Sequence, residues 1–366
     1  MTSQFSAILK HFRCQGRLVH LSSHHVGHIH DTYIATFEHK IGETQRYLLQ
    51  RINHKVFRHP SHLMENIQRV TAHLRHKIIE NSGDPTRETL TIIPTLGGKM
   101  YYKTPSNTYW RVYLYIEGAQ TYETIQHVDH IYNIARAFGR FQRLLNDFPA
   151  KELHETIPNF HHTPKRYAAF LRALEKDPYN RAKDTKEDIE FVRRRVKDTP
   201  VLINLIKSEK LPIRVTHNDT KFNNVLIDDQ TGKGLCVVDL DTVMPGLSLY
   251  DFGDAVRSGA NLAIEGQENF SEGGIDLERF EGYVYGYLDA TRNVLTPLEV
   301  SLLPFSAKLM TLECGIRFLT DYLQGDIYFK IDRPDHNLDR CRTQFTMVAD
   351  MERKFDRMER IVDKYR

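Results

Sequence analysis

The chain has 366 residues, of which 40% are hydrophobic, 27% charged and 10% aromatic, a mixture typical of globular proteins and unlike that of disordered or fibrous ones. Its 50 Lys and Arg residues nearly balance its 47 Asp and Glu residues, which argues against a nucleic-acid partner bound by bulk charge. No apolar run approaches the roughly 20 residues that cross a bilayer, and the N-terminus lacks the apolar core of a signal peptide, so we expect a cytoplasmic protein without a membrane partner.

The first 116 residues are expected to form a small β-rich lobe. Its strand candidates alternate in polarity or are rich in β-branched and aromatic residues. The first two should pair as a hairpin, because a turn around Gly42 joins them. Apolar residues at three- and four-residue steps predict a helix at 60–80. The expected strands are residues 32–37, 46–52, 90–94 and 109–116.

The rest of the chain, residues 117–366, is expected to form a larger, mainly helical lobe. One helix should begin at Thr296, which opens a capping box with Pro297 at the first helical position. The other expected elements are helices at about 131–148, 186–207 and 337–366, and strands at 213–215, 225–227 and 235–238. The fold class predicted from these elements is mixed α/β (α+β), with two lobes.

The most informative stretch is HNDTKFNN at residues 217–224, followed by VVDLD at residues 237–241. Transfer of a γ-phosphoryl group needs a carboxylate near the acceptor hydroxyl and oxygen ligands for the magnesium that bridges the phosphates. Asp219 and Asn224 lie five residues apart in a loop after an expected strand, and Asp239 ends the next hairpin, where it can return to the same site. Because Mg²⁺ takes few protein oxygens and keeps its waters and phosphates, Asn224 and Asp239 are a sufficient pair of ligands.

This pattern, H-x-D-x-x-x-x-N followed by a hydrophobic strand that ends in Asp, resembles the catalytic loop and metal-binding Asp of kinases. The His-x-Asp form with an Asp-x-Asp segment resembles the aminoglycoside phosphotransferase and choline kinase family. The longer pattern HNDTKxNN, DLDTVMPG and DFGDAxR is similar to that of the N-acetylhexosamine 1-kinases in that family. The resemblance covers most of the chain, from about Gly27 to about Arg317.

The resemblance implies a two-lobed, protein-kinase-like fold and a kinase that uses ATP and Mg²⁺. The implied reaction phosphorylates the anomeric hydroxyl of an N-acetylhexosamine, GlcNAc or GalNAc, to give the sugar 1-phosphate. The same chemistry on choline, homoserine, an aminoglycoside or another sugar is the alternative, and a nucleotide-binding scaffold without catalysis is a further one. The expected partners are therefore a nucleotide and a small-molecule sugar, and the expected state is a monomer or weak dimer.

Within this resemblance, Asp219 corresponds to the catalytic base that accepts the proton of the sugar hydroxyl. Asn224 and Asp239 correspond to the magnesium ligands, and Lys221 resembles the lysine that touches the γ-phosphate in some kinases. Asp251 begins a second motif, DFG, but is expected to lie beneath the catalytic loop and to accept backbone N–H bonds instead of binding metal.

Three nearby residues have expected roles that are less defined. Asp241 either supports the metal ligands, binds a second metal ion or caps the N-terminus of a helix. His217 is expected to hold the catalytic loop in place. Arg257 either neutralises the carboxylates of the site or pairs with Asp254.

The nucleotide is expected to contact the β-rich lobe. Gly27 lies either in a loop that covers the phosphates or in an ordinary turn, because one glycine is a weak signature, and the resemblance favours the phosphate loop. The strand lysine of kinases is missing, and Arg51 is the predicted replacement. Gln50 is the inward residue instead if the register differs by one. Glu65 is either the partner of Arg51 or a solvated charge on the following helix. Glu117 lies in the expected hinge, whose backbone would meet adenine.

The acceptor sugar is expected to lie against the helical lobe, where polar groups and aromatic faces occur together. Arg317 and Tyr328 are the predicted contacts, with Asp321 behind them. A surface ion pair is the ordinary alternative for an arginine on a helix.

Overall fold

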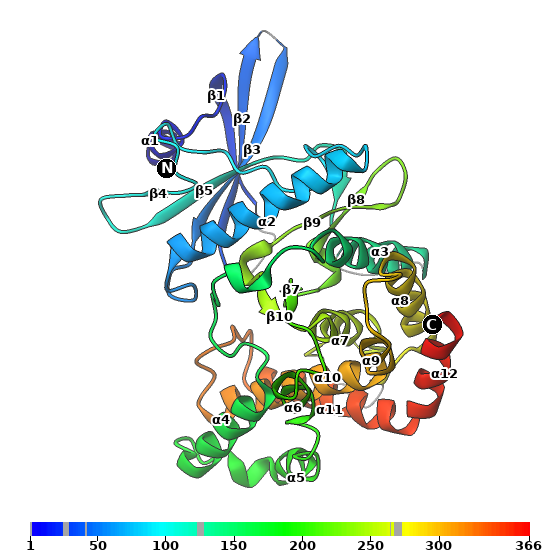
Figure 1. Cartoon of the computed structure of the whole chain (residues 1–366). Coiled ribbons are helices and arrows are strands. Elements are labelled where there is room, and N and C mark those ends of the chain that lie inside the picture. Colours follow the sequence, from blue (N-terminus) through cyan, green and yellow to red (C-terminus); the bar gives the residue numbers. More distant parts are fainter. Residues whose placement is uncertain (1, 25–28, 41, 123–127, 264, 267–272) are drawn as a thin grey trace.

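The computed structural model describes residues 2–24, 29–40, 42–122, 128–263, 265–266 and 273–366. The N-terminal part is a five-stranded antiparallel sheet with the strand order β1-β2-β3-β5-β4. Two helices, α1 and α2, accompany this sheet (Figure 1). The elements of this part are α1 (Thr2–Leu9), β1 (Arg17–His24), β2 (Asp31–Lys40), β3 (Glu43–Ile52), α2 (Pro60–Glu80), β4 (Tyr102–Lys103) and β5 (Tyr109–Leu114).

The predicted hairpin and the predicted helix at 60–80 are confirmed as β2–β3 and α2. The predicted strand at 90–94 is wrong. Ile92 forms an isolated bridge with Tyr113 of β5, but no ladder follows. Pro94 has no N–H to donate to such a ladder, which is a physical reason for the interruption.

The two faces of the sheet pack against different neighbours. Along β3, Tyr47 and Leu49 lie in a core with α1. Ile52 and the half-buried Leu48 lie on the opposite face, in the core that includes α2 and the helical part. Because side chains alternate along a strand, Gln50 is on the same face as Leu48 and Ile52. Arg111, the partner of Gln50 in β5, contacts Asp241 of the C-terminal part from this face.

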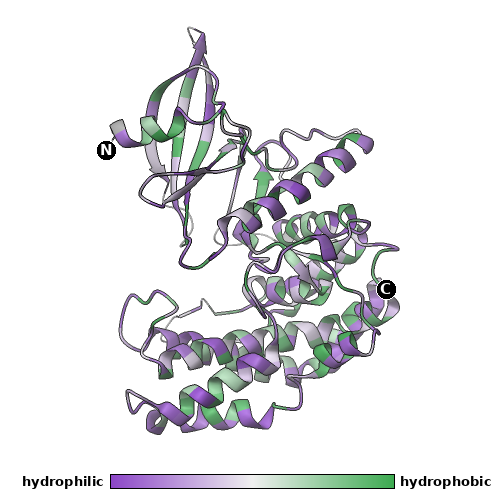
Figure 2. Cartoon of the chain, turned by 60° about the vertical axis from the view of Figure 1, so that its left-hand side comes forward, coloured by the Kyte–Doolittle hydropathy of each residue, from purple (hydrophilic) through white to green (hydrophobic). Residues whose placement is uncertain are grey.

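The C-terminal part is mainly helical, and its helices turn apolar sides toward one another and polar sides outward (Figure 2). Helix α10 packs against α4, α7 and α11, and α3 packs along α8. These helices are α3 (Val128–Leu144), α4 (Thr163–Lys176), α5 (Lys186–Arg194), α6 (Val201–Lys207), α7 (Ser248–Gly259), α8 (Leu277–Ala290), α9 (Pro297–Ser301), α10 (Leu303–Leu323), α11 (His336–Arg353) and α12 (Phe355–Tyr365).

Two predicted long helices are each two helices in the structure. The helix expected at 186–207 is divided into α5 and α6, and Pro200 stands immediately before α6. The helix expected at 337–366 is divided into α11 and α12 at Lys354. The capping box at Thr296 is confirmed, and it opens the short helix α9.

Short strands connect the two parts and carry the functional loop. β6 (Ala119–Gln120) pairs with β8 (Val225–Asp228), which pairs with β9 (Gly234–Val237). β7 (Arg214–Thr216) pairs with β10 (Met244–Gly246). The boundary expected between residues 116 and 117 falls in the connection from β5 to β6. Within the described residues, no helix combines the length and the apolar character that a bilayer crossing requires.

Candidate active site

The loop after β7 brings Asp219 and Asn224 together. The Asn224 side-chain amide donates to the backbone oxygen of Asp219 at 2.8 Å and lies 3.4 Å from the Asp219 carboxylate. The backbone oxygen of Asn224 accepts a 2.9 Å hydrogen bond from the N–H of Val238, the residue before Asp239. The loop and the end of the next hairpin therefore converge, as the spacing of the motif predicts.

A buried carboxylate supports this loop from below. Asp251, on α7, accepts hydrogen bonds from the backbone N–H groups of His217 at 2.9 Å and Asn218 at 2.7 Å. Burial is the main reason why the pKa of Asp251 is raised to about 6. The expectation that this DFG aspartate lies beneath the loop is confirmed.

His217 has a second structural contact. Its Nδ1 accepts from the backbone N–H of Asp219 at 3.3 Å, which leaves Nε2 to donate to the backbone oxygen of Val238 at 2.8 Å. His217 thus ties the loop to the hairpin end, in agreement with the structural role expected for it. Arg257 pairs with Asp254 at 2.8 Å, which is the second of its two expected roles.

Lys221 and Asp219 form an ion pair with a distance of 2.8 Å between Nζ and Oδ1. The negative charge of Asp219 is the main cause that raises the pKa of Lys221. Both side chains remain partly exposed, with 48% and 21% of their surface accessible. A cation therefore stands beside the candidate base, where it can also approach a phosphate group.

Asp239 combines an unusual backbone with an unfavourable electrostatic environment. Its φ of 58° places it in the left-handed region, which few residues other than glycine adopt. The loss of hydration and the negative charges of Asp241 and Asp219 raise its pKa. A bound cation would relieve this repulsion.

The donor set fits Mg²⁺. The Asn224 nitrogen is engaged as a donor, so its side-chain oxygen is the atom left for a metal, and Asp239 adds a carboxylate. In the part of the chain that the structure describes, no group of three or more His, Cys, Asp and Glu side chains is arranged to hold a metal. The predicted site is of another kind, since it uses an amide and a carboxylate.

Asp241 is buried and bound by two residues of the N-terminal part. Arg111 of β5 contacts both of its carboxylate oxygens, with a distance of 2.9 Å from Nη2 to Oδ2, and His30 contacts Oδ2 through Nε2. Burial alone would raise the pKa of Asp241, but the charge of Arg111 and the contact with His30 lower it well below its usual range. These contacts favour the supporting role for Asp241, because Arg111 already occupies its two oxygens.

Comparison with known proteins decides the family. The model of the phosphotransferase enzyme family matches residues 21–284. The chain belongs to this family of phosphotransferases.

Solved structures share the kinase-like fold of this phosphotransferase. An aminoglycoside phosphotransferase from Alicyclobacillus acidocaldarius superposes with a TM-score of 0.63 at 12% identity, over 98% of this chain and 96% of that one. A choline kinase from Cryptosporidium parvum gives 0.58 at 13% identity, over 100% and 99%. An amicoumacin kinase in complex with AMP-PNP, Ca²⁺ and Ami gives 0.55 at 11% identity, over 100% and 93%.

The structure corrects the register of the predicted phosphate-binding arginine in this phosphotransferase. Arg51 lies on the same face of the sheet as Trp110, its partner in β5, and forms a 3.3 Å ion pair with Asp31. Gln50 lies on the opposite face, beside Arg111, because side chains alternate along β3. The prediction of Arg51 as the inward cation is therefore wrong.

Arg111 is the residue that sequence reasoning missed. It sits in a strand that was predicted, and an arginine among aromatic and β-branched residues was the available signal. The predicted partner of Arg51, Glu65, is also placed differently: it pairs with Arg69 at 2.5 Å and with His154 at 2.8 Å.

Two further nucleotide predictions have different outcomes. Gly27 lies outside the described residues. Glu117 is in the connection after β5, where its carboxylate pairs with Arg46 and its backbone oxygen accepts a 2.9 Å hydrogen bond from Arg87. Arg87 therefore already uses one of the backbone acceptors that the hinge would offer to adenine.

The predicted acceptor residues do come together. The Arg317 guanidinium lies 5.2 Å from the ring of Phe160, 5.9 Å from that of Tyr328 and 5.4 Å from that of Phe329. Among the described residues, none is in hydrogen-bond or ion-pair contact with this guanidinium. Within that part of the chain, Arg317 therefore does not form the surface ion pair that is the ordinary alternative for an arginine on a helix.

Asp321 has a role in the backbone around Tyr328. Its carboxylate accepts N–H bonds from Ile327 at 3.0 Å, Tyr328 at 2.8 Å and Phe329 at 2.9 Å, and a bond from the Asn337 amide at 2.9 Å. Asp321 therefore lies behind Tyr328, as expected, and the role of both residues toward an acceptor stays a prediction. Because it accepts hydrogen bonds from three consecutive backbone N–H groups, the Asp321 carboxylate stabilises the conformation of the segment at residues 327–329.

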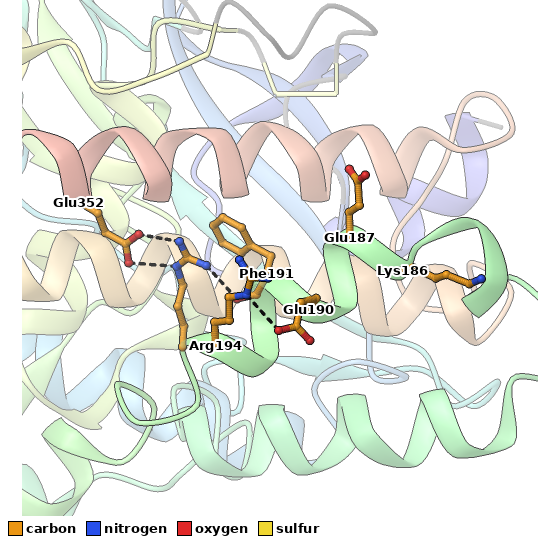
Figure 3. Close-up of a pocket in the computed structure, with 7 residues that line it drawn as sticks. Lys186, Glu187, Glu190, Phe191, Arg194 and Glu352 are labelled. Carbon is orange, nitrogen blue, oxygen red and sulfur yellow. Dashed lines mark hydrogen bonds and ion pairs between the residues drawn. The ribbon is translucent and has the colours of Figure 1, made fainter.

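A surface hollow on the helical part is not connected with these residues. It lies between α5 and α11 and is lined by charged side chains that pair with one another, as Figure 3 shows. Arg194 pairs with Glu190, and Arg195 pairs with Glu352. The lining residues are Lys186, Glu187, Glu190, Phe191, Arg194, Arg195 and Glu352.

Proposed function

We propose that this phosphotransferase is a small-molecule kinase that transfers the γ-phosphoryl group of ATP to the anomeric hydroxyl of an N-acetylhexosamine, GlcNAc or GalNAc. The observation that carries the proposal is the convergence of Asp219, Asn224 and Asp239 at the end of one hairpin. These are the groups that phosphoryl transfer requires: a carboxylate for the hydroxyl proton and oxygen ligands for a divalent cation.

In the proposed reaction, Asp219 accepts a hydrogen bond from the acceptor hydroxyl and takes its proton. The hydroxyl oxygen forms a bond to the γ-phosphorus as the bond to the bridging oxygen breaks, and ADP leaves with the electron pair of that bond. Lys221, 2.8 Å from Asp219, offsets negative charge on the transferred group. The residues contribute mainly position and charge.

Asn224 and Asp239 would hold Mg²⁺, which when bound would offset the negative charge of the phosphates. The raised pKa of Asp239 supports this role, because neighbouring negative charge disfavours its ionised form when no cation is present. The amicoumacin kinase complex, which contains AMP-PNP and Ca²⁺, is consistent with the use of a nucleotide and a divalent cation.

The acceptor assignment is supported by the motif resemblance and by the surroundings of Arg317. A sugar offers hydroxyl groups to a guanidinium and flat C–H surfaces to aromatic rings. Arg317 provides five N–H donors beside the rings of Phe160, Tyr328 and Phe329. Tyr328 is 60% exposed, so its ring is open to a ligand.

The test is ADP release from ATP and Mg²⁺ with a panel of acceptors: GlcNAc, GalNAc, their 1-O-methyl glycosides, choline, homoserine and an aminoglycoside. We expect turnover with the free sugars and none with the glycosides, which lack the anomeric hydroxyl. Asp219→Asn should lower kcat by about 10²–10⁴-fold, the usual contribution of a general base, with an unchanged melting temperature. Turnover with the glycosides, or near-normal turnover of the variant, would refute the proposal.

A further inference from the structure

The N-terminal sheet contains a buried arginine that contacts Asp241, two residues after the candidate metal ligand Asp239. Arg111 is 1% exposed, although a guanidinium is strongly disfavoured in a protein interior unless its charge and N–H groups are matched. The position across from it in β3 is the neutral Gln50. The sheet thus places this cation on β5, beside a neutral residue of β3.

The contacts of Arg111 fix the guanidinium from two sides. Its Nε donates to Gln50 Oε1 at 3.0 Å, and Gln50 in turn donates to Thr32 Oγ1 at 3.2 Å. Both Nη atoms contact the Asp241 carboxylate, in the two-pronged geometry that gives arginine–carboxylate pairs their directional character. Arg111 therefore joins the sheet to the segment that begins at Asp239.

Asp241 is also held by His30 and by a contact to its backbone. His30 Nδ1 accepts from the backbone N–H of Asn53 at 3.1 Å, so the proton is on Nε2, which faces Asp241. Thr156 Oγ1 donates to the backbone oxygen of Asp241 at 3.2 Å. The position of Asp241 is determined by residues from several elements.

The anchoring of Asp241 has a consequence for Asp239, two residues earlier. Asp239 has a φ of 58°, a conformation that a residue other than glycine keeps when its surroundings impose it. Leu240, between the two, is 1% exposed and packed in the main core. A fixed Asp241 and a fixed Leu240 leave the backbone of Asp239 little freedom, next to Val238, whose N–H donates to the backbone oxygen of Asn224.

We propose that Arg111 is a positioning residue for the metal and nucleotide site: it holds Asp241, and through it orients Asp239 toward the cation. The proposal rests on the proposed use of ATP and Mg²⁺ by this site, and is independent of which acceptor is phosphorylated. Arginine suits this role better than lysine, because its planar fork fixes the direction of the carboxylate and not merely its charge.

The test is titration calorimetry of ADP with and without Mg²⁺. The Mg²⁺-dependent gain in ADP affinity should fall by about 10–100-fold in Arg111→Met and in Asp241→Asn, the range typical of residues that orient metal ligands. Affinity for ADP without Mg²⁺ should change less than about 3-fold, because the contacts to the nucleotide itself remain. A comparable loss of metal-free affinity would mean that Arg111 binds phosphate directly, and would overturn the proposal.

Two further variants keep the test informative if a single variant does not fold. Arg111→Met combined with Asp241→Leu replaces the buried pair by apolar side chains, which proteins often tolerate without loss of stability. The Mg²⁺-dependent gain in ADP affinity should fall as much in this double variant as in either single variant, because the two residues act as one unit. Arg111→Lys, which keeps the charge without the fork, should recover only part of the gain. Full recovery by Arg111→Lys, or an unchanged gain in the folded double variant, would refute the positioning role.

Arg17→Met is the matched control, because Arg17 forms an ion pair with Glu38 in the same sheet and is 81% exposed. It should bind ADP and Mg²⁺ as the wild type does. A wild type that shows the Mg²⁺-dependent gain but no turnover with hexosamines would refute the proposed acceptor and leave this inference standing. If the wild type turns over hexosamines and the Arg111 variants keep the Mg²⁺-dependent gain in ADP affinity, the positioning role of Arg111 is refuted and the proposed acceptor is not.

Discussion

The carboxylate of Asp251 accepts a 2.7 Å hydrogen bond from the backbone N–H of Asn218, a residue 33 positions earlier in the chain. Asn218 has a φ of 65°, in the left-handed region, and directly precedes Asp219. The buried carboxylate therefore helps to hold an unusual backbone conformation next to the candidate base. Through this contact, helix α7 supports the catalytic loop.

The raised pKa of Asp251 predicts a pH-dependent contribution to stability. Its folded-state pKa is about 6, against an ordinary value of 3.8, mainly because the group is buried. The contribution is therefore complete below about pH 4 and is lost as the pH rises through 6, by about 3 kcal/mol, at roughly 1.4 kcal/mol per pKa unit. The difference in unfolding free energy between the wild type and Asp251→Asn should shrink from pH 4 to pH 7 in denaturant titrations. A difference that grows over this range would contradict the assignment.

Gly259 of α7 is predicted to tolerate alanine poorly. A Cβ atom at this position would lie 1.8 Å from the ring of Phe222, which belongs to the catalytic loop between Asp219 and Asn224. Gly259→Ala should lose about 1–3 kcal/mol of stability, as overpacked cores do, and should lower kcat because the ring displaces the loop. Gly97→Ala is the control, since nothing lies within 4 Å of its added Cβ. Melting temperatures and kcat of the two variants are compared, and equal effects would contradict the prediction.

Glu299 is predicted to stabilise the entry to the catalytic loop. It is buried and accepts hydrogen bonds from Arg214 of β7 at 2.7 and 2.8 Å, from Ser248 at 2.7 Å and from the N–H of Thr296 at 2.8 Å. Glu299→Ala should cost about 3–5 kcal/mol because it leaves the guanidinium of Arg214 without its counter-charge. Thr296→Ala should cost about 1 kcal/mol, the value of an N-cap. Equal losses in chemical denaturation would show that the ion pair adds nothing to the cap.

The same residue gives a second pH dependence with the opposite sign. Burial raises the pKa of Glu299, but its hydrogen bonds with Arg214, Ser248 and Thr296 outweigh burial and lower it. Its contribution is therefore present above about pH 4.5, its unfolded value, and is lost as the pH falls further. The stability deficit of Glu299→Ala should decrease on acidification below pH 4.5.

Asp321 is predicted to act on acceptor binding through the loop that carries Tyr328. Asp321→Ala removes the acceptor of three backbone N–H bonds, so the loop should open and hydrogen exchange at Ile327 and Phe329 should accelerate. The KM for the acceptor should rise about 10-fold, with a smaller effect on kcat, because the loss is mainly one of binding. Asp332→Ala is the control, since its side chain is 75% exposed. Unchanged exchange at the loop would refute the role.

Local chemistry was readable from the sequence in several places. The spacing of Asp219, Asn224 and Asp239 predicted a convergence that the hydrogen bonds bear out, because a short hairpin brings its two ends together whatever surrounds it. The capping box at Thr296 and the hairpin β2–β3 were also predicted, since each depends on residues a few positions apart. The two lobes followed from the change of periodicity near residue 117.

Tertiary structure alone decided what depends on register and on distant partners. A shift of one residue in β3 exchanges Gln50 for Arg51, and the packing of Tyr47 and Leu49 against α1 is what sets that register. The pairing of Arg111 with Asp241 joins residues 130 positions apart, and no local pattern marks either one as the other's partner. Sequence thus determines the chemistry that a short loop can perform, whereas the burial and orientation of charges are determined by the complete fold, because burial is a property of all the surrounding chain.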